Sequence, residues 1–218
     1  MAANVITLIR ILLVFVVVLL FQMGFYHRCI AVVLTILVLY LDSLDGYVAR
    51  KLSCASDFGA LFDITGDRIV EHIYLIYFAA AGVLSFWVPM IFITRSFLVD
   101  TLRNVAYAKT GKTPFGEKTM MTSRITKFLT ASRFMRGLYG AMKVILFVVL
   151  GVVIAYKADN PRFLPVSMFE PDSLFMLLTQ ILIWVTVVLN IIRGLPVLYD
   201  GREYLFEKSM PKELKDEV

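Results

Sequence analysis

Four aspartates within 26 residues are the side chains of this sequence best suited to chemistry. Residues three or four apart share a helix face, so each of the two pairs presents two carboxylates together. Carboxylate oxygens without histidine or cysteine are typical ligands of hard divalent cations such as Mg²⁺, Mn²⁺ or Ca²⁺. Because Mg²⁺ is commonly shared with substrate phosphates, the pattern predicts a cation site that takes a phosphorylated ligand. The stretch reads Asp42-x-x-Asp45-Gly46-x-x-Ala49-Arg50, eight residues, then Gly59-x-x-x-Asp63-x-x-x-Asp67.

The surroundings of these acids are those of a membrane protein. Apolar residues make up 59% of the 218 positions and charged residues only 18%, against about 25% in soluble domains. Each apolar run is close to the ~20 residues that a helix needs to cross a bilayer. The sequence therefore predicts an all-α integral membrane protein with six transmembrane helices in one bundle. The runs cover residues 5–25, 29–49, 64–84, 86–107, 138–156 and 173–197.

Basic residues predict the orientation of the bundle. Lysines and arginines concentrate in segments 50–58 and 103–137 and in the tail after residue 199. Basic loops face the cytoplasm, so six crossings place both termini there, together with the acidic stretch. The net charge of +5 is interpreted as topology and contact with anionic lipid rather than nucleic-acid binding.

The breaks between runs predict how the acids are positioned. The second run ends in one aspartate pair and the third begins with the other, so an antiparallel hairpin brings all four carboxylates to one membrane level. Gly194 and Pro196 predict the end of the last helix. We therefore expect a membrane domain over residues 1–198 and a polar cytoplasmic tail over 199–218.

Two other interpretations of the acids are less favoured. In an ion-pair network, Arg50 and Arg68 would neutralise the aspartates, but two cations do not balance four anions beside lipid. A divalent-cation channel or ion-coupled transporter would need acids near the midplane or an inverted repeat, and the sequence has neither a second acidic cluster nor a repeat. Glu71, one turn beyond Asp67, is interpreted as a partner of Arg68 or His72.

The acidic stretch resembles the signature of the CDP-alcohol phosphatidyltransferases. The pattern D-x-x-D-G-x-x-A-R-x8-G-x-x-x-D-x-x-x-D is matched at every fixed position, and six helices with the motif on the second and third also look like that family. The resemblance implies phospholipid biosynthesis: an alcohol attacks the lipid-side phosphorus of CDP-diacylglycerol and CMP leaves. It implies Mg²⁺, with Mn²⁺ as the alternative, and pairing as a homodimer, which the sequence itself neither supports nor excludes.

Residue roles follow from the same resemblance. Asp42, Asp45, Asp63 and Asp67 correspond to metal-binding acids, with Asp67 as the proposed base. Positions that contact the CDP-lipid are matched by residues of the motif, of the following loop and of the first helix. These are Asn4, Val5, Ile6, Thr7, Gly46, Arg50 and Ser56.

The acceptor alcohol is predicted from basic residues beyond the motif. Several arginines on different helices would suit a phosphorylated acceptor, either glycerol 3-phosphate or inositol phosphate, although arginines at helix ends also simply extend toward water. The segment from Trp87 to Arg103 is similar in layout to phosphatidylglycerophosphate synthases, but Ser96 stands where those have glutamate. The candidate acceptor-binding residues are Arg95, Arg103, Arg133, Arg136 and Arg193.

Overall fold

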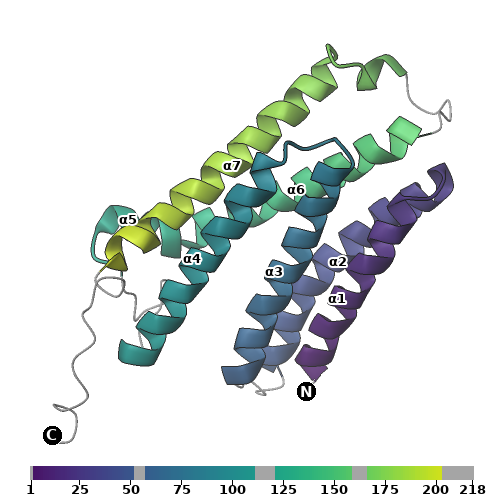
Figure 1. Ribbon diagram of the computed structural model, residues 1–218. Helices are drawn as coiled ribbons and strands as arrows, with labels where there is room; N and C mark the ends of the chain where they lie inside the picture. Colours follow the sequence, from purple (N-terminus) through teal and green to yellow (C-terminus); the bar gives the residue numbers. More distant parts are fainter. Residues whose placement is uncertain (1, 52–56, 111–120, 159–165, 203–218) are drawn as a thin grey trace, which may run out of the picture. The chain divides into compact units, whose positions relative to one another are not determined.

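The described part of the protein is helical. A computed structural model describes residues 2–51, 57–110, 121–158 and 166–202, without the side chains of 2–3, 43–51, 57–58, 60, 109–110, 157–158 and 166. Within these ranges it contains helices and turns and no strand, which confirms the predicted all-α class. The helices are α1 (Ala2–Phe21), α2 (Phe25–Lys51), α3 (Asp57–Ala80), α4 (Trp87–Thr110), α5 (Arg124–Ala131), α6 (Arg133–Ala158), a short 3-10 helix (Val166–Phe169) and α7 (Leu174–Asp200) (Figure 1).

Each predicted apolar run lies mainly on one long helix, although the runs 5–25 and 64–84 extend past the ends of α1 and α3. Four segments of the described chain are long and apolar enough to cross a bilayer: Asn4–Phe21, Phe25–Asp42, Arg124–Tyr156 and Ser167–Asp200. Helices α3 and α4 have 24 residues each but carry several charged side chains within their apolar stretches. The membrane class is therefore supported by four candidate spans, and the count of six remains a prediction.

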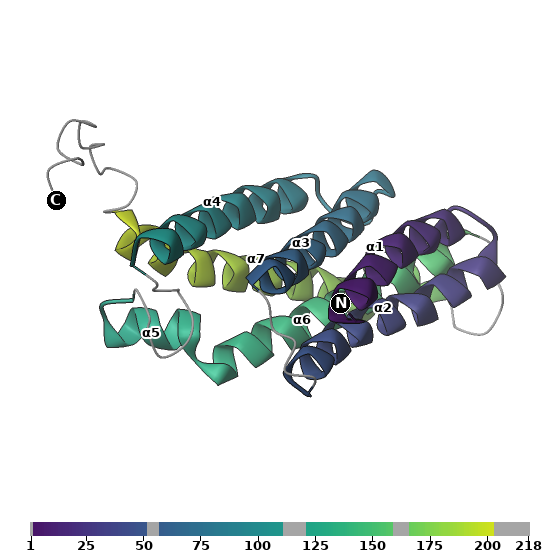
Figure 2. The same ribbon diagram turned by 90° about the horizontal axis from the view of Figure 1, so that it is seen from below.

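The chain forms two compact units, and the first contains the acidic stretch. It comprises Met1–Ile93 and Tyr139–Val188. Helix α1 packs against both α2 and α3, and the three lie side by side in both views (Figures 1 and 2). The core of this unit is aromatic: the ring of Tyr74 lies 5.8 Å from that of Phe78 and 5.3 Å from that of Phe147 on α6. This packing attaches α6 to α3 just beyond the acidic segment.

Helix α1 has an apolar face turned away from the other helices. Leu8, Leu12, Phe15 and Leu19 follow the helical repeat and are about half exposed. The opposite face buries Val14, which is fully covered. A continuous apolar stripe on a monomer marks contact with another apolar phase, and lipid satisfies it.

The second unit comprises Thr94–Leu138 and Leu189–Val218. Its buried residues Val99, Ala106, Met121 and Val197 join α4 to α7 and to the segment before α5. Asp200 accepts hydrogen bonds from the backbone nitrogen of Thr122 (3.1 Å) and from its hydroxyl (2.9 Å). The end of α7 is thereby attached to the start of the α5 segment.

The predicted end of the last helix is wrong. Helix α7 continues through Gly194 and Pro196 to Asp200. A proline inside a helix removes one hydrogen bond of the ladder, and the next residue, Val197, is fully buried in the second unit. Gly194 is also used for packing rather than termination, since a Cβ there would lie 2.8 Å from Cγ and Nε of Arg95.

Gly66 allows α1 to approach α3 closely, and this generates a first prediction. A Cβ at Gly66 would overlap the methyl group of Thr7, which is itself buried. We expect Gly66→Val to destabilise the folded protein by about 1–3 kcal/mol, because the added branches force the two helices apart. The measurement is the thermal unfolding of purified protein in detergent.

Gly140→Val is the matched control. Gly140 lies in α6 of the same unit, and a Cβ added there would meet no atom within 4 Å, so this variant shares the change in helix propensity without the overlap. Equal unfolding temperatures for the two variants would contradict the close-approach argument.

Candidate metal centre

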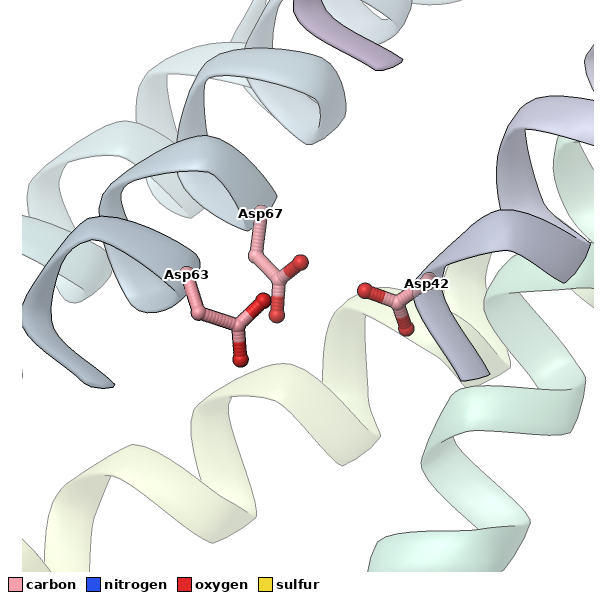
Figure 3. A group of neighbouring side chains, drawn as sticks. All are labelled: Asp42, Asp63 and Asp67. Atoms are coloured by element: carbon pink, nitrogen blue, oxygen red, sulfur yellow. The ribbon is translucent and has the colours of Figure 1, made fainter. Parts of the chain in front are cut away.

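Three of the four predicted aspartates come together in the first unit. Asp63 and Asp67 lie one turn apart on α3, and their carboxylates face that of Asp42 on α2 (Figure 3). One oxygen from each lies within 4.8 Å of the other two. Asp63 and Asp67 are four residues apart and therefore share a face of α3. Helix α1 packs against both α2 and α3, and this arrangement brings that face close to Asp42.

A buried arginine lies among these carboxylates. Arg10 of α1 places Nη2 2.7 Å from Oδ1 of Asp42 and 2.7 Å from Oδ1 of Asp67. Its Nη1 is 3.9 Å from Oδ1 of Asp63. The Arg10 side chain is 3% exposed, whereas those of the three aspartates are 42–44% exposed. The guanidinium thus lies on the inner side of the cluster, and the carboxylates are open on the other.

The described carboxylates fit a hard divalent cation. Oxygens within 4.8 Å of one another can bind one ion at the 2.0–2.6 Å distances typical of Mg²⁺ and Ca²⁺. One guanidinium against three carboxylates leaves a net charge of two negative units, which one divalent cation balances. Their exposed side leaves room for ligands from a substrate, as Mg²⁺ sites commonly require.

Other predicted donor-binding residues are only partly described. Asp45, Gly46 and Arg50 lie in α2, but their side chains are outside the described residues, as is the whole of Ser56. Asn4, Val5, Ile6 and Thr7 lie on α1 in the turns before Arg10. Val5 is exposed and Thr7 is buried against Gly66.

The role of Arg10 was not predicted from the sequence, although a signal was present. Arg10 is the one charged residue of Ala2–Phe21. A lone ionisable residue in an apolar segment is costly and points to a function or a charged partner. The cations expected beside the acids of α2 and α3 were their own neighbours in sequence, whereas the partner comes from a third helix.

A second charged cluster lies one turn further along α3. Glu71 is 4% exposed and pairs with Arg68 at 3.1 Å, which confirms the predicted partner. Lys143 of α6 lies 3.2 Å from the same carboxylate, and the hydroxyl of Tyr139 donates to it at 3.4 Å. The contacts to α6 were not predicted. These contacts connect α3 to α6 one turn beyond the carboxylate of Asp67.

The five candidate acceptor-binding arginines belong to the second unit. Arg95 and Arg103 lie on α4 and are partly buried, and Arg193 of α7 is 7% exposed. Arg133 and Arg136 lie in the first turn of α6, and both are exposed. Burial distinguishes these groups, because a cation removed from water requires anionic or polar partners.

The family model and the relatives that match this chain point to the same family. Residues 1–192 match the family model described as CDP-alcohol phosphatidyltransferase. A "CDP-diacylglycerol--glycerol-3-phosphate 3-phosphatidyltransferase" of Mycoplasma genitalium is 40% identical over 68 residues, which are 31% of this chain and 29% of the relative. A "Probable phosphatidylglycerophosphate synthase" of Mycobacterium tuberculosis is 34% identical over 105 residues, 46% of this chain and 50% of the relative.

A longer match covers most of both chains. A protein of Wigglesworthia glossinidia brevipalpis with the same name as the Mycoplasma relative is 27% identical over 168 residues, 72% of this chain and 86% of the relative. In the Mycoplasma and Mycobacterium relatives, the matched segments span half of the protein or less.

The second charged cluster generates a stability prediction. Glu71→Gln removes the anion that Arg68 and Lys143 share, and Lys143→Met removes one of its two cations. We expect Glu71→Gln to destabilise the protein by about 2–3 kcal/mol, because two neighbouring cations lose their counter-ion. Lys143→Met should cost less, since Arg68 still pairs with Glu71. Thermal unfolding in detergent measures both, and a larger loss for Lys143→Met would contradict this assignment.

Proposed function

Because the chain belongs to the CDP-alcohol phosphatidyltransferase family, we propose that it is a phospholipid-synthesising enzyme. It transfers the phosphatidyl group of CDP-diacylglycerol to a phosphorylated alcohol, glycerol 3-phosphate, and releases CMP. The observation that carries the proposal is the convergence of Asp42, Asp63 and Asp67, three fixed positions of the motif contributed by two helices. The names of the relatives support glycerol 3-phosphate as the acceptor.

The aspartates are proposed to hold the cation of the reaction. Asp42, Asp63 and Asp67, with Asp45 of the same motif, bind Mg²⁺ or Mn²⁺ through carboxylate oxygens. A divalent ion bound there supplies positive charge against the diphosphate of the nucleotide. The exposed side of the three described carboxylates is where the diphosphate is accepted.

The donor is proposed to bind through residues of the motif and of α1. Arg50 binds a phosphate oxygen, and Gly46 leaves room for the nucleotide. Ser56 and the α1 segment Asn4-Val5-Ile6-Thr7 complete the CDP-lipid contacts. Their support is the match to the family pattern and the position of α1 beside α2 and α3.

The reaction is a single displacement at phosphorus. The hydroxyl oxygen of the acceptor forms a bond to the lipid-side phosphorus, and the bond from that phosphorus to the CMP oxygen breaks. The proton of the hydroxyl passes to the carboxylate of Asp67. Electrostatic stabilisation and alignment supply most of the acceleration in such transfers, and Arg50 contributes charge on the leaving-group side.

The acceptor is proposed to be bound by arginines of the second unit. Arg95 and Arg193 are the best suited to a phosphate because they lie within α4 and α7, and Arg103 adds a third charge on α4. Arg133 and Arg136 lie nearer to solvent and attract the acceptor from solution. Ser96 remains a departure from the phosphatidylglycerophosphate synthase layout, which keeps inositol phosphate as the alternative acceptor.

The membrane arrangement is proposed on the basis of charge and helix length. Six spans, cytoplasmic termini and a cytoplasm-facing site agree with the basic segments and with the six long helices of the described chain. Residues 1–198 then form the membrane domain and 199–218 a polar tail. A homodimer is proposed from the family alone.

A panel of acceptors tests the proposed function. Purified protein in detergent, supplied with labelled CDP-diacylglycerol and Mg²⁺, is expected to release CMP with glycerol 3-phosphate and not without an acceptor. Removal of the cation by EDTA should abolish release, and added Mg²⁺ should restore it. Release with inositol phosphate alone would change the acceptor. No release with any alcohol would overturn the enzyme assignment and favour ion transport.

Asp67→Asn tests the role of the base. The amide keeps the size of the side chain and cannot accept the proton in the same way, so we expect CDP-diacylglycerol binding to persist while turnover falls by at least about 100-fold. Binding is measured with labelled donor, and turnover by CMP release. Wild-type turnover in this variant would refute the role of Asp67.

A further inference from the structure

A guanidinium nitrogen of Arg10 bridges two helices of the acidic cluster. A single nitrogen, Nη2, lies 2.7 Å from an oxygen of Asp42 and 2.7 Å from an oxygen of Asp67. These two residues come from different helices, and Arg10 comes from a third. The guanidinium therefore bridges two of the carboxylates that the proposed function assigns to a divalent ion.

A divalent ion would share these carboxylates with the guanidinium. An ion bound at about 2.0–2.6 Å from the same two oxygens would lie within a few ångströms of Nη2. Two cations at that separation repel each other, and the repulsion grows as water is removed from around them. The Arg10 side chain is only 3% exposed, so the guanidinium is shielded from water on the buried side of the cluster, whereas the open side of the carboxylates stays in contact with solvent.

We propose that Arg10 is a positioning residue whose guanidinium exchanges with the divalent ion. The guanidinium holds the carboxylates of Asp42 and Asp67 together, and ion binding moves it out from between them. This inference rests on the proposed function, since it takes the aspartates as the ion's ligands. It assigns a purpose to the one charged residue of α1.

The exchange predicts a change in metal affinity opposite in sign to that expected if Arg10 only oriented the metal ligands. A residue that merely orients metal ligands weakens binding when it is removed, typically by about 10–100-fold. A competing cation strengthens binding when it is removed. The sign of the change in affinity therefore distinguishes the two roles, independently of catalysis.

The test is Mn²⁺ binding to the purified full chain, followed by the electron paramagnetic resonance signal of free Mn²⁺. We expect Arg10→Gln to bind Mn²⁺ more tightly than the wild type, on the order of tenfold, because one positive charge beside the ion is gone. The same variant should have a lower unfolding temperature in EDTA and a larger increase on adding Mn²⁺. Unchanged or weaker Mn²⁺ binding would overturn the exchange.

Arg10→Lys covers the case in which Arg10→Gln does not fold. Lysine keeps the charge but donates from one flexible point, so it competes less well than a guanidinium. We expect a smaller increase in Mn²⁺ affinity, of about two- to threefold. Affinity equal to or below that of the wild type in Arg10→Lys would also overturn the proposal.

Arg28→Gln is the matched control. Arg28 belongs to the same unit but donates to the backbone oxygens of Met23 (2.7 Å) and Ile154 (3.0 Å). Its loss removes the same charge without touching the aspartates, so Mn²⁺ affinity should not change. An equal increase in Arg28→Gln would show a general charge effect and overturn the exchange.

Asp63→Asn separates this inference from the proposed function. If the wild type binds Mn²⁺ and Asp63→Asn binds it weakly, the metal site stands whatever the Arg10 variants do. If the wild type binds no Mn²⁺, both the metal site and the exchange are overturned.

Discussion

Mutual repulsion among the carboxylates of Asp42, Asp63 and Asp67 is the constraint on which the first unit depends. Oxygens of three acids within 4.8 Å of one another do not stay together beside apolar helices without positive charge. Arg10 supplies one such charge from the buried side. Its position requires α1 to lie close to α3, and Gly66 permits that approach by leaving space for Thr7. The aspartate cluster therefore depends on Arg10 for charge, and the position of Arg10 depends on the close helix approach at Gly66.

Helix α3 connects this charged region to the apolar core. Positions 63, 67, 71, 74 and 78 follow one another along a single face. The first two carboxylates contact Arg10 of α1, and Glu71 contacts Lys143 of α6. Tyr74 and Phe78 then pack with Phe147 of α6. A polar site that is open at one end is thus continuous with a packed aromatic core along the same helix face.

Arg10 and Glu71 pair with charged side chains of neighbouring helices within this unit. On α1, Leu8, Leu12, Phe15 and Leu19 turn outward, whereas Arg10 and Thr7 are buried together with Val14. Glu71 receives its cations from α3 itself and from α6. Because Arg10 and Glu71 meet their charged partners on the inner side of the helix packing, the described outer face of α1 stays apolar and suited to lipid.

The sequence by itself determined the membrane class, the all-α architecture, the approximate position of the long helices and the family motif. These depend on local signals: apolar runs of bilayer length, helical spacing of aspartates and fixed residues at fixed distances. The pairing of Glu71 with Arg68 was also local, since the two lie three residues apart on one helix.

Only the tertiary structure decided which distant residues complete the sites. It brought Arg10 from α1 to the aspartates, Lys143 from α6 to Glu71, and Arg95 against Gly194, and it carried α7 through Pro196. Spacing along one helix says which side chains share a face, but not which face of another helix meets them. That choice is made by packing, where a glycine that lets two backbones approach matters as much as the charges it brings together.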